Sequence, residues 1–233
     1  MEGFILAAGM GTRLKEHTAM RPKALVEVGG MTLLERTLRR MEEAGVKHIV
    51  VNVHHHADMI EDFVRGYRGR ACIDISDERR MLLDTGGALK HAAPLFSRNE
   101  NVLVHNVDIL SDIDFREVER RHCIENYLVT LCVSRRQSKT HRLLSFTPEG
   151  LLAGRSEEGL AFSGISVVSP ALFPLLPEAD SPYPVIEEYV RLSHEGHRIG
   201  SYLHPGDPTH WIDVGTPEAL KEAREKWKLS STK

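Results

Sequence analysis

Apolar residues along the chain fall into short continuous runs that alternate with segments of helical periodicity. Runs of strand length occupy residues 3–8, 48–53 and 71–76. A continuous apolar run is typical of a strand buried on both faces of a sheet. Between these runs, residues 31–44 and 57–66 carry apolar side chains every three or four positions, which predicts amphipathic helices. This β-α-β-α-β order predicts a parallel sheet with right-handed crossovers.

The second half of the chain repeats strands and helices less regularly. Its pattern predicts strands at 101–110, 127–133, 161–168 and 199–203, and helices at 86–92, 115–124, 183–195 and from about 218 to 227. Residues 134–161 combine charges with two short apolar pieces around a Pro-Glu-Gly turn, which predicts a hairpin flap. We therefore expect one α/β domain over residues 1–227: a Rossmann-like three-layer α/β/α fold with a mostly parallel central sheet, a small antiparallel flap and a frayed tail at 228–233.

Composition excludes several classes of protein. Of the 233 residues, 41% are hydrophobic and 27% are charged, and the net charge is −3. No basic field indicates nucleic acid as a partner, and no apolar run approaches the roughly 20 residues of a membrane span. The three cysteines lack the C-x-x-C spacing of a metal or redox site. We expect a cytoplasmic protein with reduced thiols and no nucleic-acid or membrane partner.

The first strand ends in a loop that combines glycine with cations. Residues 4–14 read Phe-Ile-Leu-Ala-Ala-Gly-Met-Gly-Thr-Arg-Leu, and Arg21-Pro22-Lys23 follows. Glycine lets main-chain N–H groups approach a ligand, while Arg and Lys bind phosphate oxygens. An ordinary turn with solvated cations is the alternative, because a G-x-G pair often occurs by chance. Leu14 stands where the dinucleotide fingerprint needs glycine, and the chain has no P-loop motif.

The loop resembles the L-A-A-G-x-G-T-R…P-K signature of sugar-1-phosphate nucleotidyltransferases, also called NDP-sugar pyrophosphorylases. The matching residues are Leu6, Ala7, Ala8, Gly9, Gly11, Thr12, Arg13, Pro22 and Lys23. The resemblance implies that Leu6 to Gly9, Gly11 and Thr12 bind a nucleoside triphosphate, and that Arg13 and Lys23 neutralise its phosphates as catalytic residues. Members usually carry Pro-x-Thr after the arginine; here Glu16 replaces the proline and Thr18 is kept.

A second glycine turn precedes the helix at 86–92. Leu83-Asp84-Thr85-Gly86-Gly87 resembles the family's turn whose main chain contacts the nucleobase. The resemblance therefore places Gly86 and Gly87 against the base.

Two aspartates end apolar runs that lie about a hundred residues apart. Asp108 closes the run at 101–110, where a carboxylate is costly unless it meets a cation. It matches the family's N-G-D element, with Val107 in place of the glycine, and Asp213 matches the aspartate of Trp-x-Asp-x-Gly-Thr-Pro. The resemblance implies that both hold Mg²⁺, or Mn²⁺ in its place, and that Asp108 also contacts the nucleotide. Two such acids would repel each other without a cation, so Asp108→Asn is expected to leave the apo fold intact or slightly more stable.

Other polar positions allow two interpretations each. Gly164 interrupts the strand at 161–168, which often marks a bound ligand, so we predict that it lines the substrate site. Glu187 either reaches a sugar hydroxyl or is solvated. Arg135 and Arg136 either form a solvated rim, which is favoured, or touch a sugar phosphate. Three adjacent histidines (His54, His55 and His56) cannot converge on one ion from an extended chain, so we interpret them as structural.

The resemblance spans residues 3–227, implies a GT-A-like fold, and is closest to the family's short members, which transfer a uridylyl group to N-acetylmuramate 1-phosphate. It implies a Mg²⁺-dependent reaction of UTP with that sugar or a related hexose 1-phosphate, in a monomer or small homo-oligomer. Guanylyl transfer to mannose 1-phosphate or heptose 1-phosphate is the main alternative. Molybdenum-cofactor and isoprenoid cytidylyltransferases share only the opening motif. A non-catalytic nucleotide or sugar-phosphate sensor is the alternative of another class.

Overall fold

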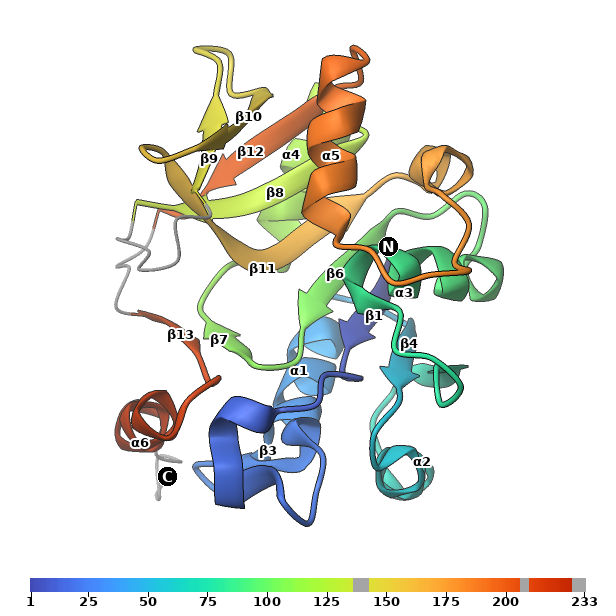
Figure 1. The fold of residues 1–233 in the computed structure, drawn as a ribbon, viewed down its shortest axis with the longest axis vertical. Coiled ribbons are helices and arrows are strands. Elements are labelled where there is room, and N and C mark those ends of the chain that lie inside the picture. Colours follow the sequence, from blue (N-terminus) through green and yellow to red (C-terminus); the bar gives the residue numbers. More distant parts are fainter. Residues whose placement is uncertain (136–142, 206–209, 228–233) are drawn as a thin grey trace.

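A single large sheet runs through the centre of the computed structural model, which describes residues 1–135, 143–205 and 210–227 (Figure 1). Seven of its strands follow the order β10-β9-β11-β6-β1-β4-β5, and β8 pairs with both β11 and β12. The strands are β1 (Glu2–Leu6), β4 (His48–Val53), β5 (Cys72–Asp77), β6 (Val102–Asn106), β8 (Val129–Ser134), β9 (Leu143–Phe146), β10 (Leu152–Ser156), β11 (Leu160–Val168) and β12 (Ile199–Leu203).

The strands that carry the glycine loop and its neighbours are parallel. Strand β1 pairs in parallel with β4 and β6, and β4 pairs in parallel with β5. Strand β11 runs antiparallel to both β6 and β8. The antiparallel β9–β10 hairpin joins this edge through β11. Residues 136–142 of the predicted flap, Arg136 among them, and the predicted tail at 228–233 lie outside the described residues.

Helices cover both faces of the sheet, which confirms the predicted three layers (Figure 1). One core packs side chains of α1, α2, α4 and α6 against the sheet, and a second core packs those of α3 and α5. Adjacent residues Phe4 and Ile5 are both fully buried, in different cores, so the continuous apolar run of β1 serves both faces. The helices are α1 (Leu33–Glu43), α2 (Ala57–Gly66), α3 (Asp84–Ala92), α4 (Phe115–Glu125), α5 (Val185–His194) and α6 (Pro217–Lys226).

Short elements complete the fold and build its loops. Strand β7 (Ile109–Ser111) pairs with β13 (Trp211–Asp213), and β2 (Glu27–Val28) pairs with β3 (Met31–Thr32). Short 3₁₀ helices are η1 (Thr12–Thr18), η2 (Lys23–Leu25), η3 (Ala93–Leu95) and η4 (Pro170–Leu175). The run at 101–110 is thus two strands, because the chain turns between Asn106 and Ile109 and leaves Asp108 in the turn.

Helix starts follow the capping residues that the sequence indicates. The Asp114 carboxylate accepts hydrogen bonds from the N–H groups of Arg116 and Glu117 at the start of α4. Thr216 caps α6, whose first residue is Pro217. Both helices thus begin with a side chain that caps their first N–H groups.

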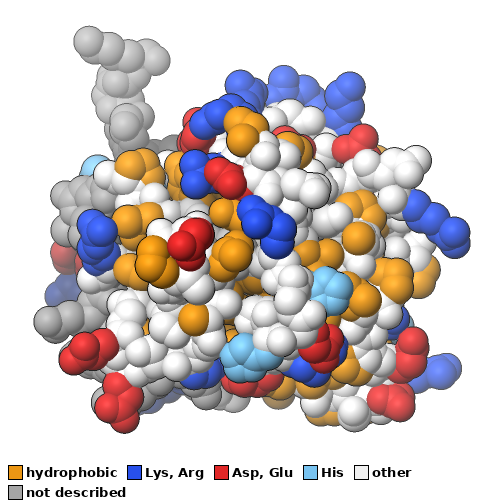
Figure 2. Space-filling model, turned by 90° about the horizontal axis from the view of Figure 1, so that it is seen from above, with side chains coloured by type: hydrophobic (Ala, Val, Ile, Leu, Met, Phe, Trp, Pro, Cys, Tyr) orange, Lys and Arg blue, Asp and Glu red, His pale blue; other side chains and the backbone are white. Residues whose placement is uncertain are grey.

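The surface carries charges of both signs. Figure 2 shows the end of the molecule near β10 and α5, where Lys and Arg side chains lie among Asp and Glu side chains. This agrees with the small net charge of −3. Within the described ranges, no helix has both the length and the apolar composition needed to cross a bilayer.

Candidate active site

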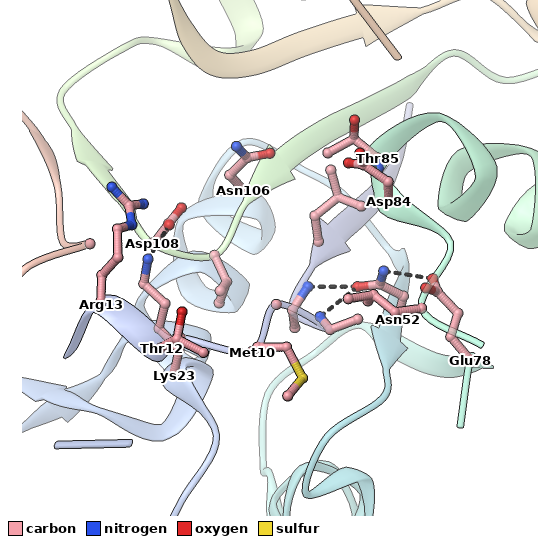
Figure 3. Close-up of a pocket in the computed structure, with 18 of the residues that line it drawn as sticks. Met10, Thr12, Arg13, Lys23, Asn52, Glu78, Asp84, Thr85, Asn106 and Asp108 are labelled. Carbon is pink, nitrogen blue, oxygen red and sulfur yellow. Dashed lines mark hydrogen bonds and ion pairs between the residues drawn. The ribbon is translucent and has the colours of Figure 1, made fainter. Parts of the chain in front are cut away.

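The glycine loop after β1 lines a cavity of about 600 Å³ at the carboxyl ends of the parallel strands. Ligands of open α/β sheets bind at this edge. All the predicted loop residues meet here, and Asp108 joins them from the turn after β6: the wall includes Leu6, Ala7, Ala8, Gly9, Gly11, Thr12, Arg13, Lys23 and Asp108 (Figure 3).

The loop is shaped by its two glycines in different ways. Gly11 has a φ of 63°, and a Cβ there would lie 3.0 Å from Thr18 Cγ2. A Cβ on Gly9 would find no heavy atom within 4 Å, so the chain is open to the cavity at that point. The hydroxyl of Thr18, which is retained from the family motif, donates a hydrogen bond of 2.9 Å to Gly11 O. This bond closes the loop even though Glu16 replaces the proline.

A buried amide, which the sequence analysis did not single out, fixes the start of the loop. Asn52 on β4 is 2% exposed, and its Oδ1 accepts hydrogen bonds from the N–H groups of Ala7 (2.6 Å) and Ala8 (3.1 Å). Its Nδ2 donates to Glu78 Oε1 at 2.7 Å (Figure 3). The sequence did contain a sign of this role, because Asn52 interrupts a run of β-branched residues. A polar side chain at such a buried position needs a hydrogen-bond partner.

Glu78 connects this network to the other side of the cavity. Its Oε2 accepts a hydrogen bond of 3.1 Å from the N–H of Leu83, just before α3. Burial raises the pKa of the Glu78 carboxyl, although its hydrogen bonds oppose that shift. His54 Nδ1 contacts the main-chain oxygen of Glu78 at 2.7 Å, which is a structural contact for the first of the three histidines.

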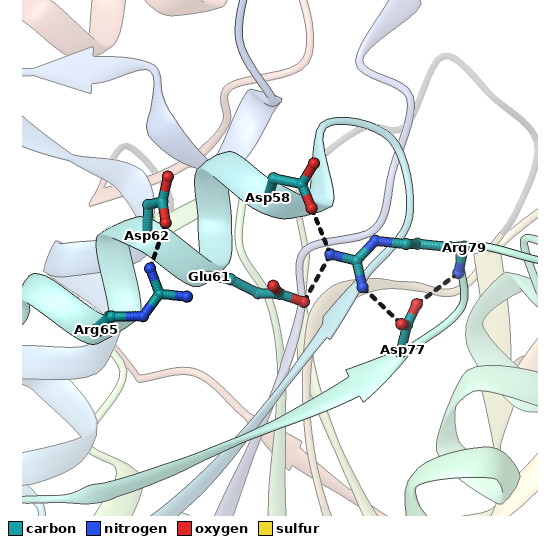
Figure 4. Close-up of polar contacts among 6 residues, drawn as sticks. All are labelled: Asp58, Glu61, Asp62, Arg65, Asp77 and Arg79. Carbon is teal, nitrogen blue, oxygen red and sulfur yellow. Dashed lines mark hydrogen bonds and ion pairs between the residues drawn. The ribbon is translucent and has the colours of Figure 1, made fainter.

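Next to Glu78, an exposed arginine fastens β5 to α2. Arg79 donates hydrogen bonds of 2.6–2.7 Å to the carboxylates of Asp77, Asp58 and Glu61 (Figure 4). The backbone N–H of Arg79 also donates to Asp77, and this bond is the largest favourable contribution to the lowered pKa of that carboxyl. The chain is therefore held on both sides of Glu78, so its carboxylate faces Asn52.

The second aspartate lies beside the cavity on the β7–β13 pair, and Gly215 from the same segment lines the wall. Asp213 lies opposite Ile109 in that antiparallel pair, and the N–H of Val214 donates a 2.8 Å hydrogen bond to Asp108 O. Gly215 lets the Arg13 and Asp213 side chains lie close to the main chain, because a Cβ there would be 2.7 Å from Arg13 Nη2 and 2.8 Å from Asp213 Oδ1 and both would have to shift. Two carboxylates that are distant in the sequence thus meet.

One ammonium group lies between these carboxylates. Lys23 is only 7% exposed, and its Nζ donates a short hydrogen bond to Asp108 Oδ2. The same Nζ is 3.9 Å from Asp213 Oδ1, and Arg13 Nη2 is 3.9 Å from Asp213 Oδ2. The structure therefore brings together the two residues that the resemblance assigned to phosphate binding and the two that it assigned to metal binding.

The second glycine turn is used for packing. The N–H groups of Gly86 and Gly87 both donate to Tyr183 O, at 2.9 and 3.4 Å. A Cβ on Gly86 would lie 2.4 Å from the Tyr183 ring, so glycine allows residues 181–183 to lie against α3. The preceding residues Asp84 and Thr85 line the cavity instead. Contact of Gly86 and Gly87 with a base stays a prediction.

Of the two predicted substrate residues, one lines a side chamber of the cavity and the other lies beside it. Gly164 forms part of this chamber's wall, and its φ of 74° accompanies a shift of register in β11. A Cβ there would lie 2.8 Å from Ile109 Cγ1, so close packing alone requires glycine. Glu187 pairs with Arg155, which does line the chamber. Arg135 is exposed, as expected for a rim residue.

Comparison with known proteins identifies the family. Residues 3–145, well over half of the chain, match the family of MobA-like NTP transferase domains. The chain belongs to this family. Its fold agrees: HddC from Yersinia pseudotuberculosis in complex with GMP-PN superposes with a TM-score of 0.80 at 24% identity, over 97% of this chain and 99% of that one. The predicted nucleotidyltransferase class, and with it the prediction of an enzyme, is confirmed.

Curated relatives of this NTP transferase act on sugar phosphates. An N-acetylmuramate alpha-1-phosphate uridylyltransferase from Neisseria meningitidis is 31% identical over 96% of this chain and 97% of the relative. One from Caulobacter vibrioides is 46% identical, but over only 45% of this chain and 44% of the relative. The mannose-1-phosphate guanyltransferase beta-A of Xenopus laevis is 28% identical over 94% of this chain and 62% of that protein.

Proposed function

We propose that the chain transfers a uridylyl group from UTP to N-acetylmuramate 1-phosphate or a closely related sugar 1-phosphate. The observation that carries this proposal is that Arg13, Lys23 and Asp108 line the cavity beside the glycine loop, with Asp213 3.9 Å from both cations. The full-length similarity to the Neisseria uridylyltransferase favours this nucleotide and this sugar.

The reaction needs charge stabilisation more than proton transfer. An oxygen of the sugar 1-phosphate attacks the α-phosphorus of the nucleotide, a new P–O bond forms, and the bond to the β-phosphate breaks as pyrophosphate leaves. The attacking oxygen is already ionised at neutral pH, so no general base is required. Arg13 and Lys23 lie where they can neutralise the two approaching anions and the charge that shifts to pyrophosphate.

The two aspartates fit a divalent cation. Carboxylate oxygens are the ligands that Mg²⁺ prefers, with phosphate oxygens and water completing its shell. The described residues contain no set of three or more His, Cys, Asp or Glu side chains placed to hold an ion, so substrate would have to supply further ligands. The Lys23 ammonium between the carboxylates already shows that this point favours positive charge. When bound, Mg²⁺ or Mn²⁺ would stabilise charge on the α-phosphate.

A panel assay tests the proposal. UTP, GTP, CTP, ATP and dTTP are each offered with N-acetylmuramate 1-phosphate and with mannose 1-phosphate, and released pyrophosphate is measured with Mg²⁺ or with a chelator. We expect turnover with UTP and N-acetylmuramate 1-phosphate that stops with the chelator and returns with Mg²⁺ or Mn²⁺. Activity that persists in the chelator would refute the metal site.

Guanylyl transfer to mannose 1-phosphate is the second candidate. It is favoured by the similarity to the Xenopus guanyltransferase, which covers 94% of this chain. A clear preference for GTP and mannose 1-phosphate in the same panel would establish it in place of uridylyl transfer.

A further inference from the structure

The side chamber has a volume of about 310 Å³ and joins the main cavity. The two share Leu6, Asp84, Thr85 and Asn106 as walls. Arg13, Lys23 and Asp108 line only the main cavity, so the side chamber adjoins that cavity without including these charged residues. If the chain joins a nucleotide to a sugar 1-phosphate, this chamber is the place for the sugar.

One cation lines this chamber among the described residues. Arg155 extends from β10, and its side chain is 35% exposed. Its Nε and Nη2 donate hydrogen bonds of 3.2 and 2.6 Å to a single oxygen of Glu187. Glu187 is itself 55% exposed, so this is a partly solvated pair whose partner can move away. The guanidinium has five N–H groups, and the remaining ones are available for a second carboxylate.

Apolar residues line the same chamber as the guanidinium. Phe162 from β11 and the pair Val185 and Ile186 at the start of α5 line the wall with Arg155. A carboxylate that is attached through a short apolar group would fit this combination of one cation and several apolar surfaces. Asp84 also lines the chamber, and its negative charge would repel an acidic group, so such a group is expected to bind at Arg155.

We propose that Arg155 recognises a carboxylate on the sugar and selects sugar 1-phosphates that carry an acidic substituent over neutral ones. This inference rests on the proposed transfer to a sugar 1-phosphate and names the class of sugar. The phosphate of the substrate has its cations in Arg13 and Lys23, whereas a neutral sugar would offer Arg155 no anion. The ether-linked carboxyalkyl group of N-acetylmuramate has the required chemistry, a carboxylate beside a methyl group.

The test compares two sugar 1-phosphates that differ only in the acidic substituent. N-acetylmuramate 1-phosphate and N-acetylglucosamine 1-phosphate are offered with UTP to the native protein, to Arg155→Gln and to Arg191→Gln. Arg191 on α5 is the matched control. Like Arg155, it forms ion pairs with glutamates (Glu188 and Glu195), but it does not line the chamber. The readouts are kcat/KM from pyrophosphate release and Kd from calorimetry with each sugar 1-phosphate alone.

A charge-assisted contact with a carboxylate predicts a selective loss. Arg155→Gln should lower the preference for the acidic sugar by about tenfold or more, in both kcat/KM and Kd, while Arg191→Gln leaves it unchanged. An equal loss with both sugars would assign Arg155 to the 1-phosphate and overturn the inference, and so would an unchanged preference.

The affinity readout keeps this inference separate from the proposed reaction. If no nucleotide supports turnover, the proposed function fails, yet a preference in Kd that depends on Arg155 still supports recognition of the carboxylate. If turnover occurs with both sugars and Arg155→Gln changes neither ratio, the function stands and the inference fails.

Discussion

At the scale of single residues, the central feature is the buried ammonium of Lys23 between Asp108 and Asp213. The ammonium donates a short hydrogen bond to Asp108 and lies 3.9 Å from Asp213. It therefore compensates the negative charge of both carboxylates. The sequence predicted two uncompensated acids that repel each other, and that was wrong. The error arose because Lys23 had been assigned to phosphate alone, and the sequence does not show that its side chain is buried.

Lys23→Met keeps the aliphatic stem and removes the charge. We expect turnover to fall by at least tenfold, since a charge-assisted contact contributes about 1.5–3 kcal/mol. We also expect the free energy of unfolding to fall by about 1–3 kcal/mol in chelator, because Asp108 loses its ion pair. Added Mg²⁺ should raise the Tm of Lys23→Met more than that of the native protein, where the ammonium competes. Near-native turnover would contradict the assignment of Lys23, and Arg21→Met provides an exposed control.

Asp108→Asn gives the reciprocal comparison. This variant leaves a buried lysine whose remaining carboxylate is 3.9 Å away, so we expect lower stability in the absence of metal, not the unchanged or higher stability inferred from the sequence. Asp213→Asn should cost less, because Asp213 makes the longer contact. Thermal melts of both variants in chelator check this order, and equal stability of Asp108→Asn and the native protein would refute it.

At the scale of elements, the glycine loop depends on a side chain from the neighbouring strand. The N–H groups of Ala7 and Ala8 both bond to Asn52, and Asn52 in turn bonds to Glu78, which holds the chain before α3. One hydrogen-bonded network therefore sets the distance between the glycine loop and the segment before α3, which both line the cavity.

Asn52→Ala removes the acceptor for two main-chain donors and the partner of a buried carboxyl. We expect the free energy of unfolding to fall by about 1–3 kcal/mol, which is the usual cost of unsatisfied buried groups. The KM for nucleotide should rise as well, because the loop loses its anchor. Denaturant melts and nucleotide titrations measure the two effects. Asn99→Ala, at an exposed position, should change neither, and an unaltered KM in Asn52→Ala would show that the loop holds its shape alone.

The sequence predicted most helices and strands. It did not predict why glycine is needed at particular positions. Helix α2 and strand β12 have the predicted bounds, because periodicity and flanking turns define them. Gly164 and Gly86 are explained by close contacts with Ile109 and Tyr183, and no sequence pattern distinguishes such packing from approach to a ligand. The Asn52–Glu78 contact was not predicted, because a polar residue in a strand does not reveal its distant partner.

At the scale of the whole molecule, two buried histidines make the stability of the fold depend on pH. Burial lowers the pKa of His105 on β6 to about 3 and that of His122 on α4 to about 4. In the unfolded chain, a histidine has a pKa of about 6.5. Between these values the unfolded state takes up protons that the folded state excludes, so stability falls as the pH falls from about 6.5 towards 4.

His122→Asn tests this linkage while keeping a polar group near Thr130, which His122 Nδ1 contacts at 2.9 Å. Proton uptake by His122 in the unfolded state should lower the stability of the native protein by about 1–2 kcal/mol between pH 7 and pH 5. The variant lacks this contribution, so its stability should fall by about 1–2 kcal/mol less over the same range. Denaturant melts at both pH values measure the difference. The same substitution at His91, which is exposed on α3, controls for the loss of a histidine as such.

The β7–β13 pair has a consequence for how the protein becomes functional during synthesis. Asp108 and Asp213 meet only when this pair closes, across about a hundred residues of chain. The chain is synthesised from its N-terminus, so the segments of β1, β4 and β6 are made before Asp213. The glycine loop and Lys23 are therefore made early, whereas the pair of carboxylates cannot form until Asp213 has been synthesised and β13 has paired with β7.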